Sequence, residues 1–259
     1  MALVDKTKGA LMALAGRAAN SHPAVRRAVD RRLHSPGHSA RKRFYAQFVG
    51  TGDVVFDVGA NMGNRTDVFQ ELGATVVAVE PQQACQRVLA RRYGDHPRVH
   101  IVNGGLGPEA GERTLYVGSE HTLTTMSSDW IDATRRSGRF ASYSWEEQTV
   151  VPITTLDQLI AEHGTPRFCK IDVEGFEVEV LEGLSRPLHV VSLEFAAEFL
   201  DRTRAALALL TALGPCRFNL SSGETYALDL PEWIDGPTIE AEMAGLGDLA
   251  FGDVYVRFD

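Results

Sequence analysis

Cysteine is scarce in this sequence, and long apolar runs are missing from it. The three cysteines, Cys85, Cys169 and Cys216, are too few and too scattered for a disulfide framework or a cysteine-based zinc site. No stretch approaches the roughly 18 unbroken apolar residues of a membrane span. The 259 residues are 44% hydrophobic and 23% charged, which is typical of a globular protein. Reduced cysteines and the missing span predict a cytoplasmic protein.

Positive charge is concentrated at the N-terminus. Residues 1–43 contain ten Lys and Arg against Asp5 and Asp30, a net charge of +8, whereas the whole chain carries −8 and the remainder therefore −16. A basic arm can bind nucleic acid, an anionic membrane or an acidic partner surface. We favour a helical extension, residues 1–44, that packs on the acidic body or joins copies of the chain, and we expect no nucleic acid. Helices are predicted at 1–20 and 23–33.

The stretch 54–63, VVFDVGANMG, lacks the second glycine of a dinucleotide-binding turn. Its apolar start, its glycines and the helical spacing that follows predict the strand, turn and helix of a nucleotide-binding unit. The next strand ends at Glu80, where an acid is placed to bind ribose hydroxyls. Asn61 occupies the position of the missing glycine, and Asp57 would repel a phosphate. The pattern therefore favours a cationic nucleoside without phosphate, such as S-adenosylmethionine.

A second polar stretch, RFCKIDVEGFE at 167–177, places acids at a strand end. Residues 168–171 are predicted to form a strand that leads to Asp172 and Glu174, and the next strand, 188–193, is predicted to end at Glu194. These acids should face the same crevice as Glu80, because the carboxyl ends of parallel strands meet at one edge. Buried neighbouring acids are costly unless they are paired, protonated or metal-bound.

The remaining segments complete an α/β domain, residues 45–259. Glu177 and the other acids of the helix predicted at 176–184 are expected on its solvated surface. Residues 118–147, between strands expected at 112–117 and 149–153, are predicted to be a long irregular segment. Its aromatic residues favour a lid or substrate wall, or a local core. A hairpin is predicted from 216–220 and 226–228, and a last antiparallel strand at 251–258.

Five stretches resemble the FkbM family of S-adenosylmethionine-dependent methyltransferases. They are FDVGANMGNRT at 56–66, VEP at 79–81, VPITTLD at 151–157, KIDVEGFEVEVLEG at 170–183 and SLEF at 192–195. The resemblance implies a class I methyltransferase (Rossmann-like) fold, with a seven-stranded, mostly parallel sheet in the order 3-2-1-4-5-7-6. It also implies O-methylation of a hydroxyl on a sugar or secondary metabolite, hence a role in carbohydrate or natural-product biosynthesis.

The resemblance also implies a set of site residues. Asp57, Gly59, Asn61 and Gly63 would shape the methionine pocket, and Glu80 would hold the ribose. Asn103 follows the third strand, where it is placed to hydrogen-bond adenine. The full set expected to bind the cofactor is Asp57, Gly59, Asn61, Gly63, Asn64, Thr66, Glu80, Pro81, Asn103, Gly104 and Asp172.

Methyl transfer to a hydroxyl needs a base or a metal, because a sugar hydroxyl is a poor acid. The catalytic candidates are Asp172, Glu174, Glu194 and His121. Asp172 and Glu194 are also the candidate ligands for Mg²⁺. Two other functions stay open: an NAD(P)-dependent oxidoreductase, disfavoured by Asn61 and Asp57, and a non-catalytic nucleoside- or nucleic-acid-binding module.

Overall fold

The computed structural model describes residues 37–247 and 250–259. The chain divides into two compact units, Met1–His38 and Ser39–Asp259, of which the second forms the fold below. The helices predicted at 1–20 and 23–33 lie outside the described residues. Among those described, no helix is both long enough and apolar enough to span a membrane.

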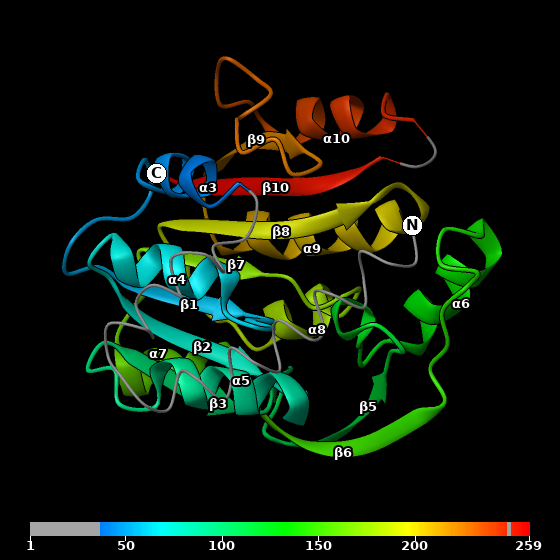
Figure 1. The fold of residues 1–259 in the computed structure, drawn as a ribbon. Coiled ribbons are helices and arrows are strands. Elements are labelled where there is room, and N and C mark those ends of the chain that lie inside the picture. The colour runs from blue at the N-terminus through cyan, green and yellow to red at the C-terminus, as the bar shows by residue number, and fades with distance from the viewer. Residues whose placement is uncertain (1–36, 248–249) are drawn as a thin grey trace. The chain divides into compact units, whose positions relative to one another are not determined.

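A seven-stranded sheet runs through the domain (Figure 1). Its strands are β1 (Val54–Val58), β2 (Thr75–Glu80), β3 (Val99–Asn103), β7 (Phe168–Ile171), β8 (Val190–Ala196), β9 (Cys216–Ser222) and β10 (Phe251–Phe258). Their order is β3-β2-β1-β7-β8-β10-β9. The pairs among the first five strands are parallel, whereas β10 is antiparallel to β8 and β9. Counted within this sheet alone, the order is 3-2-1-4-5-7-6, which confirms the predicted fold.

Helices cover both faces of the sheet because alternate strand residues point to opposite sides. Val55, Phe168 and Tyr255 belong to the hydrophobic cluster under the helices on one face, whereas Phe56 and Cys169 belong to the cluster on the other. The first face carries α3 (His38–Tyr45), α4 (Asn64–Glu71) and α5 (Gln83–Tyr93). The second carries α7 (Leu156–His163), α8 (Glu177–Glu182), α9 (Leu200–Leu213) and α10 (Gly236–Ala244).

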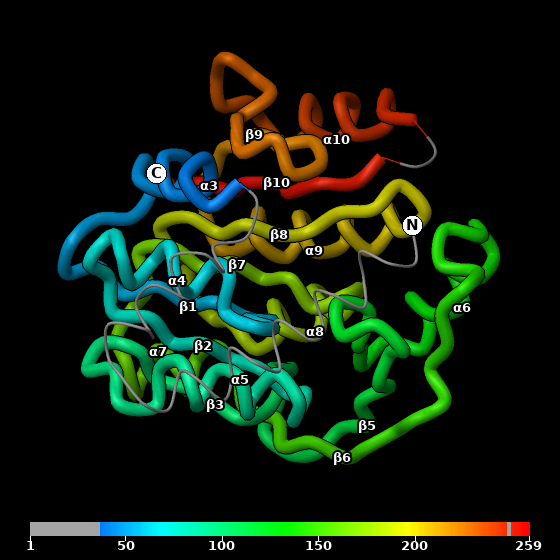
Figure 2. Tube along the Cα trace, viewed as in Figure 1, coloured from blue at the N-terminus to red at the C-terminus, as the bar shows by residue number. Residues whose placement is uncertain are grey.

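A smaller sheet, in the order β4-β6-β5, lies beyond the carboxyl ends of the central strands (Figure 2). Its strands are β4 (Gly105–Leu106), β5 (Gly111–Val117) and β6 (Glu147–Thr154). The predicted strands at 112–117 and 149–153 are therefore confirmed, and they form an antiparallel pair.

The prediction of a wholly irregular segment at 118–147 is wrong. The segment contains a 3₁₀ helix, η1 (His121–Leu123), and α6 (Ser128–Ser137). Ser127 caps α6 by accepting a hydrogen bond from the amide of Trp130, and Gly138 ends it with a left-handed φ of 76°. Trp130 packs with Leu123 and the other aromatic residues of the segment in a local hydrophobic cluster.

The predicted hairpin of 216–220 with 226–228 is also wrong. β9 instead pairs with β10, and residues 226–228 form no strand. Tyr226 has a φ of 52°, a left-handed conformation that a β-strand does not accommodate. A further 3₁₀ turn, η2 (Ala197–Phe199), joins β8 to α9.

An aromatic cluster holds α3 and the turn after it on the sheet. Phe48 stacks on Phe168 and on Tyr255, with ring centroids 5.5 and 5.4 Å apart, and Tyr45 meets Phe168 edge-on at 5.5 Å. Phe168 and Tyr255 belong to central strands, so the cluster joins the chain before β1 to the middle of the domain.

We predict that Phe48→Ala lowers the free energy of unfolding by about 3–5 kcal/mol, because it leaves a cavity among these rings. Urea denaturation would measure the loss. Phe251→Ala is the matched control, since Phe251 is 45% exposed and its truncation should cost about 0.5 kcal/mol or less. Equal losses for the two variants would show that the cluster does not anchor this segment.

Candidate active site

A cavity of about 270 Å³ lies at the carboxyl ends of the parallel strands. The turns after β1 and β2, the loop after β7, Glu194 of β8 and residues of the segment 121–126 contribute to its lining. Its size is near the lower end of the roughly 300–1,000 Å³ usual for small-molecule pockets. This position is where open α/β sheets bind their ligands.

The turn after β1 lies against the loop after β7. Gly59 has a φ of 81°, and a Cβ there would lie 1.8 Å from the carbonyl oxygen of Asp172. Glycine is therefore required both by the backbone conformation and by the contact. Two positions on, Asn61 also has a left-handed φ, 51°, and lines the cavity.

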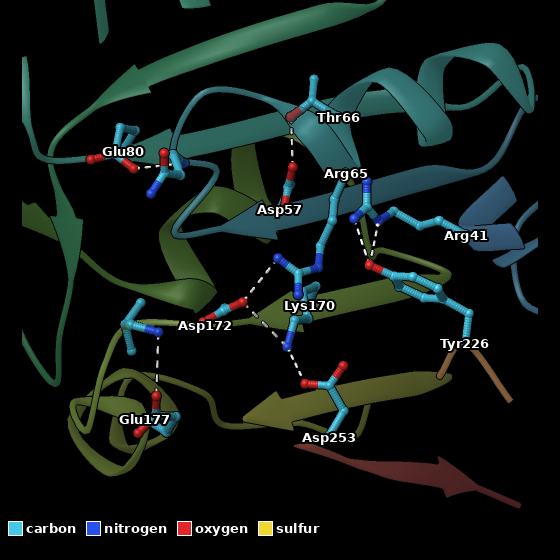
Figure 3. A network of polar contacts seen from close by, with 12 residues as sticks. Arg41, Asp57, Arg65, Thr66, Glu80, Lys170, Asp172, Glu177, Tyr226 and Asp253 are labelled. Atoms are coloured by element: carbon cyan, nitrogen blue, oxygen red, sulfur yellow. Dashed lines mark hydrogen bonds and ion pairs between the residues drawn. The ribbon is translucent and has the colours of Figure 1, made fainter. Parts of the chain in front are cut away.

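Glu80 ends β2 and is held by two backbone amides. The amide of Asn61 donates to its Oε2 (Figure 3) and the amide of Gln82 to its Oε1, both at 2.7 Å. Burial raises the pKa of Glu80 to about 7, against the effect of these two hydrogen bonds. The carboxyl group lines the cavity with both oxygens fixed in position.

Three of the predicted cofactor residues lie behind this surface. Asp57 is 1% exposed and accepts a hydrogen bond of 2.5 Å from the hydroxyl of Thr66 (Figure 3). Burial raises the pKa of Asp57. Gly63 precedes α4 with a φ of 84°, and a Cβ there would meet the ring of Tyr93 at 2.8 Å. These residues shape the turn, while Gly59, Asn61, Asn64, Glu80, Pro81 and Asp172 line the cavity.

The end of β3 lies outside the cavity lining, unlike the ends of β1 and β2 and the loop after β7. Asn103 is exposed, and Gly104 packs so closely on Pro152 that a Cβ would lie 2.6 Å from the carbonyl oxygen of that proline. Of the described residues that line the cavity, none belongs to β3, whereas Gly105 and Leu106 of β4 do.

Asp172, Glu174 and Glu194 form an acidic cluster, with one carboxylate oxygen from each lying within 4.8 Å of the others. Asp172 follows β7, and Glu174 has a left-handed φ of 53°. The prediction that Glu194 follows its strand is wrong: β8 continues to Ala196, because β10 pairs with it beyond the end of β7. Leu193 of β8 pairs with Ile171 of β7. Glu194 and Asp172 are the next residues along these two strands, so the two acids still lie close together.

Two cations neutralise part of this cluster (Figure 3). The Nη1 of Arg65 lies 3.0 Å from Asp172 Oδ2, and the buried Nζ of Lys170 lies 3.6 Å from the same oxygen. Lys170 also donates to Asp253 of β10. Burial alone would lower the pKa of Lys170, but Asp172 and Asp253 raise it above its usual range.

The pKa values of the three acids are shifted in different directions. Burial alone would raise the pKa of Asp172, but Lys170 and Arg65 hold it below its usual value. Burial, then the neighbouring acids, raise the pKa of both Glu174 and Glu194 well above the ordinary range. Lys170 and Arg65 therefore favour the ionised form of Asp172, whereas burial and the neighbouring acids favour the protonated forms of the two glutamates.

Glu177 is buried, so the prediction that it lies on a solvated surface is wrong. It is 8% exposed, and its Oε1 accepts hydrogen bonds from the amides of Val173 and Gly175 at 3.2 and 3.3 Å. Glu177 thus supports the loop that carries Asp172 and Glu174. Burial raises the pKa of Glu177 to about 7.

His121 lines the cavity beside the turn after β1. Asn61 Nδ2 donates to its carbonyl oxygen at 3.5 Å, so η1 sits beside the turn after β1. The ring Nε2 lies 3.3 Å from an oxygen of Glu120.

Sequence reasoning missed a part of the cavity wall outside the predicted motifs. Arg41 of α3 lines the cavity, and its Nε donates to the hydroxyl of Tyr226 at 3.1 Å (Figure 3). Glu224, two residues before Tyr226, lines it too. Arg41 and Tyr226 are 185 residues apart in the sequence, so no local pattern could have predicted their contact.

We predict that Glu177→Gln flattens the pH dependence of stability. Folded Glu177 keeps its proton up to about pH 7, whereas the unfolded chain releases it near the ordinary value of 4.5. The free energy of unfolding should therefore fall as the pH rises from about 4.5 to about 7, and glutamine removes this contribution. Urea denaturation at pH 5 and pH 8 measures the difference, with exposed Glu182→Gln as the control. An unchanged pH dependence in Glu177→Gln would contradict the assignment.

No curated protein sequence matches the chain. Precorrin-6y C5,15-methyltransferase from Geobacter metallireducens is similar in structure, at 10% identity and a TM-score of 0.44 over 85% of this chain and 87% of that one. A TehB-like SAM-dependent methyltransferase from Corynebacterium glutamicum is also similar in structure. It is 12% identical, with a TM-score of 0.42, and the match covers 91% of this chain and 100% of that one. Likenesses this distant carry no information about the acceptor.

The sequence comparison is more specific. The sequence model of the methyltransferase FkbM domain matches residues 57–214, which is more than half of the chain. The matched span includes Glu80 and the acidic cluster, and it ends before Glu224 and Tyr226. The chain therefore belongs to the FkbM family of S-adenosylmethionine-dependent methyltransferases.

Proposed function

We propose that this protein transfers a methyl group from S-adenosylmethionine to a hydroxyl group of a small acceptor, a sugar or another secondary metabolite. The observation that carries the proposal is a single cavity that joins a ribose-type acid, Glu80, to a cluster of three further acids. One end suits a nucleoside, and the other suits the removal of a proton from a hydroxyl.

The charge of the cavity supports a cationic cofactor. Its wall includes five carboxyl groups against two arginines, Arg41 and Arg65. A sulfonium and an amino group would stabilise the ionised forms of these acids, which burial and mutual repulsion disfavour, whereas the pyrophosphate of a dinucleotide would add to the repulsion. Asn61 also stands where a dinucleotide site has glycine. The residues therefore fit S-adenosylmethionine better than NAD(P).

The acidic wall also favours a small acceptor over nucleic acid. Nucleic-acid binding depends on Lys and Arg that neutralise phosphates, and here acids prevail around the acceptor end. Hydroxyl groups, in contrast, donate readily to carboxylates. Arg41 and Glu224 stand outside the span shared with the family, so they are the residues we expect to adapt the cavity to its own acceptor.

When bound, S-adenosylmethionine supplies an electrophilic methyl group on a sulfonium. The carboxylate of Glu80 is placed to accept hydrogen bonds from the two ribose hydroxyls, since each of its oxygens retains a free lone pair. Glu80 therefore positions the nucleoside. Such alignment of reactants can contribute on the order of 7–11 kcal/mol to a lower barrier.

The acidic cluster is placed to orient the acceptor hydroxyl and to take its proton. Arg65 and Lys170 fix Asp172 and stabilise its ionised form, so Asp172 is the group that we expect to accept a hydrogen bond from the hydroxyl. The raised pKa values of Glu194 and Glu174 favour their protonated forms beside it. A general base of this kind typically contributes about 10²–10⁴-fold to the rate.

The oxygen ligands of the cluster also fit a hard cation such as Mg²⁺. Asp172, Glu174 and Glu194 would hold it, and the ion would lower the pKa of the acceptor hydroxyl.

We predict that Glu80→Ala weakens the binding of S-adenosylmethionine by about 1.5–3 kcal/mol, as expected for hydrogen bonds to a charged group. Isothermal titration calorimetry would measure this, with Glu120→Ala, an exposed neighbour of η1, as the control. Unchanged affinity in a folded Glu80→Ala variant would rule out the ribose role. Wild-type binding of NAD in preference to S-adenosylmethionine would favour an oxidoreductase instead.

We predict that Asp172→Asn lowers kcat by at least about 100-fold while the affinity for S-adenosylhomocysteine changes little. Asparagine keeps the shape but loses the charge that acts on the acceptor. A mass-spectrometric screen across sugars, glycosides and polyketides would first identify the acceptor. Asp201→Asn, at an exposed position, is the control. Near-normal turnover would mean that Asp172 merely caps the turn before α8, which asparagine also does.

The same assay separates a direct base from a metal. Loss of turnover in EDTA, with rescue by Mg²⁺ or Mn²⁺, would support the metal, and turnover that EDTA does not affect would support the direct base.

A further inference from the structure

The adenine of the cofactor must lie on the far side of Glu80 from the acidic cluster, because the ribose connects the adenine to the sulfonium end. This inference rests on the proposed binding of S-adenosylmethionine. The strand beyond β2 in the sheet is β3, yet no described residue of β3 lines the cavity. The rest of the wall includes β4 and His121, Thr122, Thr124, Thr125 and Met126, which we call the 121–126 segment. Thr125 Oγ1 donates to the carbonyl oxygen of Glu174 at 2.7 Å, so the segment extends from Glu80 toward the acidic cluster.

A chain of hydrogen bonds ties this segment to Glu80. The amide of Gln82 donates to Glu80 Oε1 at 2.7 Å, and the side-chain Nε2 of Gln82 donates to Thr124 Oγ1 at 2.9 Å. The thiol of Cys85 donates to Gln82 Oε1 at 3.0 Å, which fixes the side-chain amide with its NH₂ group toward Thr124. Burial raises the pKa of Cys85 to about 12, so the thiol keeps the proton that it donates.

Thr124 has a proton left to donate. A hydroxyl group donates once and accepts twice. The oxygen of Thr124 accepts from Gln82 Nε2 and from the amide of Gly118, at 2.9 and 3.2 Å. Both acceptor positions are therefore filled, and the bonds that Thr124 makes within the described part of the chain leave its hydroxyl proton undonated. Thr124 is partly exposed and lines the cavity.

The surroundings of Thr124 suit a flat heterocycle. Leu106 and Met126 offer apolar surfaces. Gly105 permits this arrangement, because a Cβ there would lie 2.8 Å from the terminal carbon of Met126. A ring bound between such walls presents its edge to polar groups. The ring nitrogens of adenine are acceptors, and Thr124 supplies a donor.

We propose that the 121–126 segment, rather than the end of β3, forms the adenine pocket, and that Thr124 donates its hydroxyl proton to a ring nitrogen of adenine. The segment is part of the connection between β5 and β6, so recognition of the base depends on the smaller sheet. Thr124 thereby becomes a specificity-determining residue for the cofactor.

The test is calorimetric titration of the full-length protein with S-adenosylhomocysteine. Thr124→Val, which keeps the shape but removes the hydroxyl, should weaken binding roughly 3- to 10-fold. Thr124→Ser should bind as wild type does. Thr114→Val, at an exposed position of β5, is the matched control. Unchanged affinity in Thr124→Val would overturn the proposal, as would a loss confined to Asn103→Ala.

Analogues of S-adenosylhomocysteine separate recognition of adenine from support of the fold. The 1-deaza, 3-deaza and 7-deaza forms each replace one ring nitrogen by carbon. If Thr124 bonds to one of them, Thr124→Val should no longer weaken the binding of that analogue. Equal weakening for all three would show that Thr124 acts only by holding Gln82 and Gly118, and the proposal would fail. Failure of the wild type to bind S-adenosylhomocysteine would instead refute the proposed function itself.

Discussion

The site depends on the charge of Lys170, which is buried at the centre of the sheet. Its Nζ lies between Asp172 and Asp253, so it links β7 to β10 across the intervening strand β8. A lysine in this position is costly unless it is paired, and the two carboxylates pair it. The charge in turn holds the pKa of Asp172 below its usual value, whereas burial and the neighbouring acids raise the pKa values of Glu174 and Glu194. The same ammonium group of Lys170 therefore stabilises the charge of Asp172 and connects the strands of the sheet.

The residues proposed to bind the nucleoside and those proposed to act on the acceptor lie at different strands along one edge of the sheet. Glu80 stands at the end of β2, and the acidic cluster stands across β7 and β8, with β1 between them. The close approach of Gly59 to the Asp172 carbonyl brings the two regions together. The smaller sheet supplies the remaining wall through residues that a plain doubly wound domain does not have. The ends proposed for the nucleoside and for the acceptor thus belong to different elements of one cavity.

The sequence predicts best what depends on short-range patterns. The glycine turn after β1, the acid that ends β2 and the strand before Asp172 all follow from local runs of residues, and the sheet order follows from the family resemblance. The helix α6 also had local signals, the cap at Ser127 and the glycine at 138, but the aromatic composition of its segment obscured them.

What the sequence does not predict depends on contacts between distant segments. Glu194 lies inside β8 because β10, 60 residues later, extends the pairing of that strand. Glu177 is buried because it bonds to amides of a loop whose path no periodicity shows. The contact of Arg41 with Tyr226 joins opposite ends of the domain sequence.

A crystal structure of the protein with S-adenosylhomocysteine would test the central claim most directly, because it would locate both ends of the cofactor at once. The account predicts ribose hydroxyls within hydrogen-bond distance of the Glu80 carboxylate and the sulfur atom facing Asp172 and Glu194. A nucleoside bound elsewhere, or a sulfur atom turned away from the acidic cluster, would contradict it.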